Sequence, residues 1–148
     1  MIAFDANVHL PRPGETAEQM LMDDTSMDAG ALLNSFNSYQ LHLGKRLHAA
    51  NFMVLTNALS REEMGQLCIS VERAFPGSAV TWMADFRAHD AAHRLAQMKE
   101  VGVAAVKFHS YVQQIGKDDV PAAVALAKTA GDLGLPILID TSYGGVSM

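Results

Sequence analysis

Apolar and polar residues alternate in short stretches along this chain, and longer segments with helical periodicity separate them. The strand-like stretches cover residues 2–10, 51–57, 79–86, 103–111 and 136–143. Most of the gaps carry apolar residues three and four positions apart, the spacing of an amphipathic helix. Regular alternation of strand and helix is typical of βαβ units. The pattern therefore predicts an α/β fold with a parallel sheet.

Local signals predict where the helices begin and end. Ser60 and Glu63 have the spacing of a capping box, which predicts a helix from there to about residue 75. Asp90 is expected to cap a helix that runs through residue 100 and stops at Gly102, a residue that readily adopts the left-handed conformation.

Two further helices are expected, one late in the chain and one in the first connection. Asp118 or Asp119 is expected to cap a helix that stops at Gly134. The connection over residues 11–46 is long, and its apolar residues predict a packed helix that begins near residue 28. Such a long connection is either a lid over a site or a cover for the base of the sheet.

A parallel sheet of this kind either closes into an eight-stranded barrel or stays open. A complete TIM barrel takes about 250 residues, whereas this chain has 148 residues and five expected strands. We therefore expect an α/β fold with partial TIM-barrel architecture of about five β/α units, with an open doubly wound parallel sheet as the alternative. Residues 1–148 would form a single barrel domain, complete or truncated. Its two open sheet edges predict a homo-oligomer.

Composition narrows the class of protein. Hydrophobic residues make up 49% of the chain and the net charge is -5, values that are typical of a globular protein and unlike a nucleic-acid binder with clustered Lys and Arg. No apolar run approaches the roughly 20 residues that span a bilayer. We therefore expect a cytoplasmic protein without a nucleic-acid or membrane partner. Cys68 is the single cysteine and is expected to be a buried small hydrophobe.

Polar side chains gather where the expected strands end. They are Asn7 and His9, Thr56 and Asn57, Asp85 and Arg87, Lys107 and His109, and Asp140, Thr141 and Ser142. Carboxyl ends of parallel strands meet at one edge, where β/α proteins place their active sites. Buried polar groups cost free energy unless they are bonded. This clustering predicts a site for a small-molecule substrate, ringed by the strand-to-helix loops.

Lys107 and His109 lie two residues apart and therefore share one face of their strand. Three functions are open to a buried lysine there: a carbamylated metal ligand, an amine that forms a Schiff base, or a cation that anchors a substrate carboxylate. The alternative without function is an ion pair with Asp85 or Asp140 across the sheet, because buried lysines are normally paired. For His9 and His109 the corresponding alternative is a core histidine that ties two strands together.

Two motifs resemble the amidohydrolase superfamily of metal-dependent hydrolases. Its first strand ends Asp-Ala-His-x-His, where this chain has residues 5–9 with Asn7 in place of the first histidine. Its fourth strand reads Gly-x-x-x-Val-Lys-x-His, as residues 102–109 do here. The resemblance implies a TIM barrel that hydrolyses a C–N, ester or lactone bond, or performs a related decarboxylation. It implies zinc on His9 and His109, while Asn7 favours the metal-independent lactonases of the superfamily.

The remaining assignments follow from position and residue type. We expect Lys107 and Asp140 to be catalytic, with Asp140 as general base or metal ligand. The expected substrate-binding residues are Asn7, Asp85, Arg87, Tyr111 and Ser142. Two alternatives come from other classes of protein: a Schiff-base lyase with Lys107 as nucleophile, and a non-catalytic degenerate or truncated barrel.

Overall fold

The computed structural model describes residues 4–9, 49–55, 57, 59–110 and 112–140, and for residues 4–9 it describes the backbone alone. Five strands form one sheet. They are β1 (Phe4–His9), β2 (Ala49–Val54), β3 (Ala79–Met83), β4 (Ala105–His109) and β5 (Ile137–Asp140). All four pairings are parallel, and the strand order β1-β2-β3-β4-β5 follows the sequence. The predicted α/β fold with a parallel sheet is confirmed.

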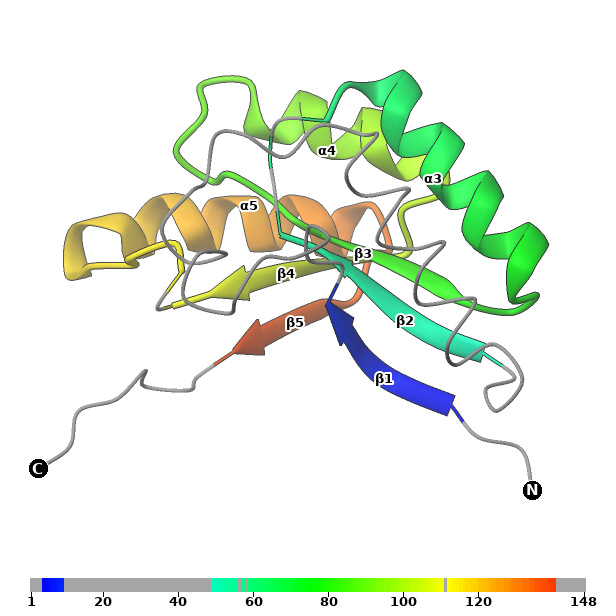
Figure 1. The fold of residues 1–148 in the computed structure, drawn as a ribbon. Coiled ribbons are helices and arrows are strands. Elements are labelled where there is room, and N and C mark those ends of the chain that lie inside the picture. Colours follow the sequence, from blue (N-terminus) through cyan, green and yellow to red (C-terminus); the bar gives the residue numbers. More distant parts are fainter. Residues whose placement is uncertain (1–3, 10–48, 56, 58, 111, 141–148) are drawn as a thin grey trace, which may run out of the picture.

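In the described residues three α-helices connect the strands. They are α3 (Arg61–Ala74), α4 (Ala91–Glu100) and α5 (Val120–Asp132), the last preceded by a short 3₁₀ turn, η1 (Lys117–Asp119). All three lie on the same face of the sheet (Figure 1). Among the described pairings β1 and β5 are the edge strands, so these residues show a parallel sheet and no closure into a barrel.

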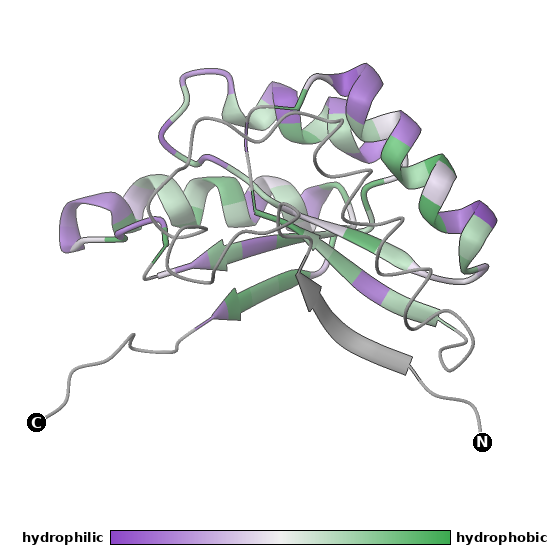
Figure 2. Cartoon of the chain, in the orientation of Figure 1, coloured by the Kyte–Doolittle hydropathy of each residue, from purple (hydrophilic) through white to green (hydrophobic). Residues whose placement is uncertain are grey.

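The main core lies between the sheet and the helices. Alternate strand residues such as Phe52, Trp82 and Val106 are at most 2% exposed and belong to one apolar cluster with Leu67 of α3 and Leu95 of α4. Figure 2 shows strands β2 to β5 as mostly hydrophobic and helices α3 and α4 with polar residues on the side away from the sheet. This is the amphipathic pattern that the helical periodicity predicts.

The opposite face of the interior strands is also buried. Thr81, Met83 and Lys107 point to that face and are 0%, 2% and 3% exposed. Thr81 donates a hydrogen bond of 2.7 Å to the Asn51 carboxamide on β2, which satisfies two buried polar groups. Interior strands of parallel sheets are normally buried on both sides. Unlike the helix-side face, this face carries polar and titratable residues.

The expected helix signals are confirmed in part. Ser60 accepts the backbone N–H of Glu63, and Glu63 accepts that of Ser60, so the capping box is present. Gly102 and Gly134 have φ angles of +110° and +70° after α4 and α5. Asp90 precedes α4, but its side chain makes no capping hydrogen bond, which corrects that expectation.

Other boundaries differ from the expectation. The carboxylate of Asp119 binds the N–H of Gly116 and so closes η1 instead of capping α5. β2 covers Ala49–Val54 where residues 51–57 were expected, and β3 ends at Met83, although the loop residues Ala84 and Phe86 are buried and continue the apolar alternation of the strand. The helix expected near residue 28 and the strand residues after 140 lie outside the described residues.

Exposed apolar side chains mark the β5 side of the sheet and lead to a first prediction. Ile137 and Ile139 are 37% and 68% exposed, and Val124 on α5 is 61% exposed. An open strand edge beside apolar surface favours association. We expect concentration-dependent self-association in sedimentation experiments, weakened roughly tenfold or more by Ile139→Lys, since burial of one isoleucine contributes about 1.5–3 kcal/mol.

Ile69→Lys provides the matched control, because Ile69 is 61% exposed on α3, away from this edge. A chain that stays monomeric at high concentration and binds no hydrophobic dye would contradict the prediction and favour a self-sufficient open sheet.

Candidate functional site

Three titratable side chains converge where β4 and β5 end. The Lys107 Nζ atom lies 3.5 Å from Oδ2 of Asp140, and the His109 Nε2 atom lies 3.4 Å from the same oxygen. His109 and Asp140 are register partners at the last rung between the two strands. One carboxylate oxygen thus lies near two nitrogen atoms. The ion pair between Lys107 and Asp140, which the sequence offered as the alternative without function, is present.

Lys107 is the most deeply buried of the three. Its side chain is 3% exposed, and Nζ lies 3.3 Å from Sδ of Met53 on β2. β2 and β4 are separated by β3, so in a flat sheet their axes would lie roughly 9 to 10 Å apart. Contact between their side chains fits a face that is concave here. Met53 is also the backbone register partner of His9, which brings the end of β1 to the same level.

The protonation of His109 follows from its neighbours. Burial lowers the pKa of His109, the Asp140 charge opposes this, and the Lys107 charge adds to it. Nδ1 accepts a hydrogen bond of 3.4 Å from the N–H of Val112. A neutral imidazole that accepts at Nδ1 carries its proton on Nε2. The protonated nitrogen is therefore the one that faces Asp140.

Two loop residues that the sequence pattern did not single out hold this edge together. Ser110 donates from its hydroxyl and its N–H to the Asp140 carbonyl, at 3.0 and 3.4 Å. The Gln113 carboxamide accepts the N–H of His109 at 2.9 Å and donates to the Ala84 carbonyl at 2.8 Å. No local sequence signal marks either residue, because both act through contacts with other strands.

Asp85 and Arg87 organise the loop after β3. Asp85 accepts the backbone N–H of Arg87, and the Arg87 guanidinium binds both carboxylate oxygens of Asp119 at 2.8 and 2.6 Å. This guanidinium lies 4.4 Å from the ring centre of Phe86. Its hydrogen bond holds the pKa of Asp119 below the usual value. Arg87 therefore links two loops at the site, and substrate binding by Asp85 and Arg87 stays a prediction.

The other predicted site residues are not brought into the described geometry. Tyr111 and Ser142 lie outside the described residues, as do the side chains of Asn7 and His9. Their assigned roles stay predictions.

The zinc prediction can be compared with the donor atoms that are present. His109 Nε2 and Asp140 Oδ2 are two potential ligands, 3.4 Å apart. Catalytic zinc sites normally use three protein ligands. Within the described part of the chain no group of three His, Cys, Asp or Glu residues could hold a metal ion. These residues alone do not fit a zinc centre.

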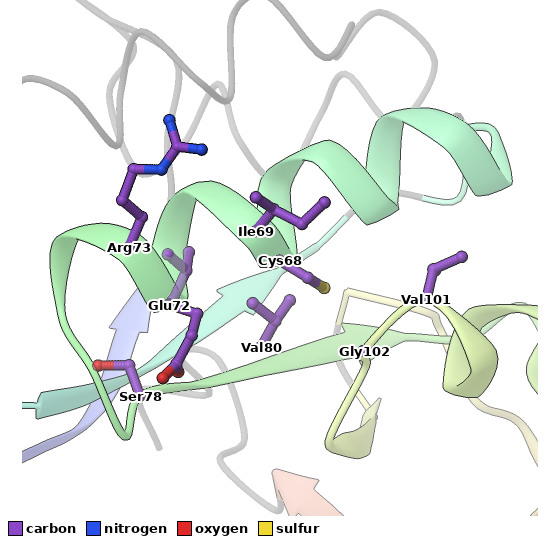
Figure 3. Close-up of a pocket in the computed structure, with 9 residues that line it drawn as sticks. Cys68, Ile69, Glu72, Arg73, Ser78, Val80, Val101 and Gly102 are labelled. Carbon is purple, nitrogen blue, oxygen red and sulfur yellow. The ribbon is translucent and has the colours of Figure 1, made fainter.

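A surface hollow of about 490 Å³ lies elsewhere, between α3 and the turn that precedes β4 (Figure 3). Its lining includes Cys68, Val80 and Val101, with Glu72 and Arg73 at its side. Burial raises the pKa of the Cys68 thiol to about 11. The hollow lies away from the Lys107, His109 and Asp140 cluster and contains no activated nucleophile.

None of the helices in the described residues is long and apolar enough to cross a membrane.

Comparison with known proteins adds no family assignment. No family model matches the chain, and neither curated proteins nor solved structures gave a match. Function is therefore inferred from the geometry of the site.

The charges around His109 yield a second prediction. In NMR titrations Asp140→Asn should lower the pKa of His109 further, because it removes the charge that favours imidazolium, and Lys107→Met should raise it. Asp132→Asn on the exposed end of α5 should leave it unchanged. The pKa of His109 is lower in the folded chain than its unfolded value of 6.5. At pH values between these two pKa values the unfolded state binds more protons, so the stability of the fold should decrease as the pH falls through this range. Shifts in the opposite directions would contradict this arrangement.

The Cys68 thiol yields a third prediction. With a pKa of about 11 it is protonated at neutral pH, so it should react with disulfide reagents far more slowly than a free cysteine. The reaction should accelerate in urea, which exposes the thiol. Equal rates for folded and unfolded chains would show that Cys68 is accessible and reactive in the fold.

Proposed function

We propose that this chain is an amidohydrolase-like β/α hydrolase that acts on a C–N, ester or lactone bond of a small molecule in the cytoplasm. The convergence of Lys107 and His109 on one oxygen of Asp140 is the observation that carries the proposal. The three residues come from two neighbouring strands and meet at the sheet edge where β/α enzymes place their chemistry.

The fold supports a barrel-type winding over a doubly wound sheet. A doubly wound sheet reverses its strand order at a switch point and carries helices on both faces. Here the five strands run in sequence order, and the described helices lie on one face. The contact between Lys107 and Met53 across β3 fits an inward curvature.

Each side chain has a role in the proposed hydrolysis. Asp140 takes a proton from a water molecule whose oxygen attacks the substrate carbonyl carbon. Lys107 and the protonated Nε2 of His109 face the oxygen that bears the negative charge of the resulting tetrahedral intermediate. Cleavage of the C–N or C–O bond follows, and the leaving group takes up the proton that Asp140 received.

The main alternative is a Schiff-base lyase with Lys107 as the nucleophile. A lysine needs an uncharged amine to attack a carbonyl, whereas Lys107 lies in an ion pair with Asp140. This pairing favours the hydrolase. Borohydride reduction in the presence of a carbonyl substrate should leave no covalent adduct on Lys107.

Activity assays with purified full chain provide the fourth prediction. The panel should contain γ-butyrolactone, p-nitrophenyl acetate and an N-acetylated amino acid, with metal content measured in the same preparation. We expect hydrolysis of at least one of the three, lowered about 10²- to 10⁴-fold by Asp140→Asn, the usual contribution of a general base. Asp132→Asn should retain the wild-type rate.

An Asp140→Asn variant that folds and keeps full activity would contradict the proposed role. A wild-type chain that hydrolyses none of the panel would favour the non-catalytic alternative. Loss of activity on chelation, with zinc in the preparation, would restore the predicted His9 and His109 metal site in place of direct activation by Asp140.

A further inference from the structure

The Gln113 carboxamide occupies an unusual place between two strands. Met83 and Lys107 are register partners in the parallel ladder of β3 and β4. In such a ladder the next rung would join the N–H of His109 directly to the carbonyl of Ala84. The N–H of His109 instead donates to Oε1 of Gln113, whose Nε2 donates to the Ala84 carbonyl. A side-chain amide is thus inserted into the rung and holds the two strand ends apart.

On its other side β4 remains hydrogen-bonded to β5 at the same level. His109 is in register with Asp140 on β5, and Ser110 donates to the Asp140 carbonyl. The end of β4 consequently separates from β3 while it remains bound to β5. This asymmetry keeps the His109 ring beside Asp140 and opens the sheet edge on the β3 side.

The same glutamine closes the turn that follows β4. Its N–H donates to the His109 carbonyl at 2.9 Å, and its Oε1 accepts the His109 N–H at 2.9 Å. Within this doubly closed turn the N–H of Val112 reaches Nδ1 of His109. Occupation of Nδ1 by a backbone donor leaves the ring proton on Nε2, the nitrogen 3.4 Å from Asp140.

We infer that Gln113 is a positioning residue, which wedges β3 and β4 apart and fixes His109 as the tautomer with its proton on Nε2, facing Asp140. The catalytic meaning of this arrangement rests on the proposed hydrolase function, but the geometry and the tautomer do not. Gln113 touches no reacting atom and acts through His109. A side-chain amide suits this task because it offers one acceptor and one donor in a fixed plane.

NMR of the full chain tests the inference independently of any activity. In the wild type the imidazole nitrogen shifts of neutral His109 should show protonation at Nε2, and no coupling through a hydrogen bond should join the His109 amide nitrogen to the Ala84 carbonyl carbon. Gln113→Ala removes the carboxamide between the two strands. The coupling between His109 and Ala84 should then appear, and the imidazole of His109 should become a mixture of both tautomers. Gln66→Ala, the same change on the exposed face of α3, should alter neither signal.

A second variant covers the case in which Gln113→Ala fails to fold. Gln113→Glu keeps an acceptor for the His109 N–H but loses the donor to Ala84, so the tautomer should be retained while the bridge to β3 is lost. Imidazole shifts that stay at their wild-type values in a folded Gln113→Ala chain would overturn the inference. If Gln113→Ala does not fold, a mixed tautomer in Gln113→Glu would overturn it instead.

The hydrolase proposal can fail separately from this inference. A chain with the expected tautomer response and no hydrolytic activity retains the positioning role of Gln113 and loses the proposed function.

Discussion

The burial of a lysine on the face of the sheet opposite the helices is the constraint on which the site depends. An ammonium group removed from water costs several kcal/mol unless an opposite charge compensates it. Lys107 is 3% exposed, and a carboxylate oxygen of Asp140 lies 3.5 Å from Nζ. Since the two residues belong to neighbouring strands, the pairing of charges also requires β4 and β5 to end at the same level.

That requirement is consistent with the many side-chain hydrogen bonds at the carboxyl edge of the sheet. Ser110 ties the backbone of β4 to Asp140, while the Gln113 carboxamide separates the same strand from β3. The Arg87 and Asp119 pair joins the loop after β3 to η1 before α5. The loops at this edge are therefore held by side chains from several units, which suits a site whose groups must keep fixed distances.

Much of the framework follows from short-range patterns. The capping box of Ser60 and the glycines that end α4 and α5 rest on interactions within a few residues. The five strands pair over long distances in the sequence, but each is marked by its own run of apolar residues. Strand parity also places Lys107 and His109 on one face before any contact is known. The convergence of these two residues on Asp140 needs only the further assumption of parallel neighbouring strands.

The parts that could not be predicted depend on long-range geometry. Gln113 and Asp119 act on residues about thirty positions away, at Ala84 and Arg87, and no local pattern distinguishes a glutamine in a turn from any other polar loop residue. The capping role expected of Asp119 fails for the same reason, since its carboxylate is used by Gly116 and Arg87. The predicted end of β3 is too late because the loop residues Ala84 and Phe86 are buried and continue the alternation of the strand.

A double-mutant cycle on Lys107 and Asp140 tests whether Asp140 compensates the charge of the buried lysine. Free energies of unfolding would be measured by urea for Lys107→Met, Asp140→Asn and the double variant. Because loss of either partner leaves the other charge without its counter-charge, we expect the double variant to lose less stability than the sum of the two single losses, with a coupling above about 1 kcal/mol. Losses that add to within about 0.5 kcal/mol would contradict this expectation and show that Asp140 does not compensate the buried lysine.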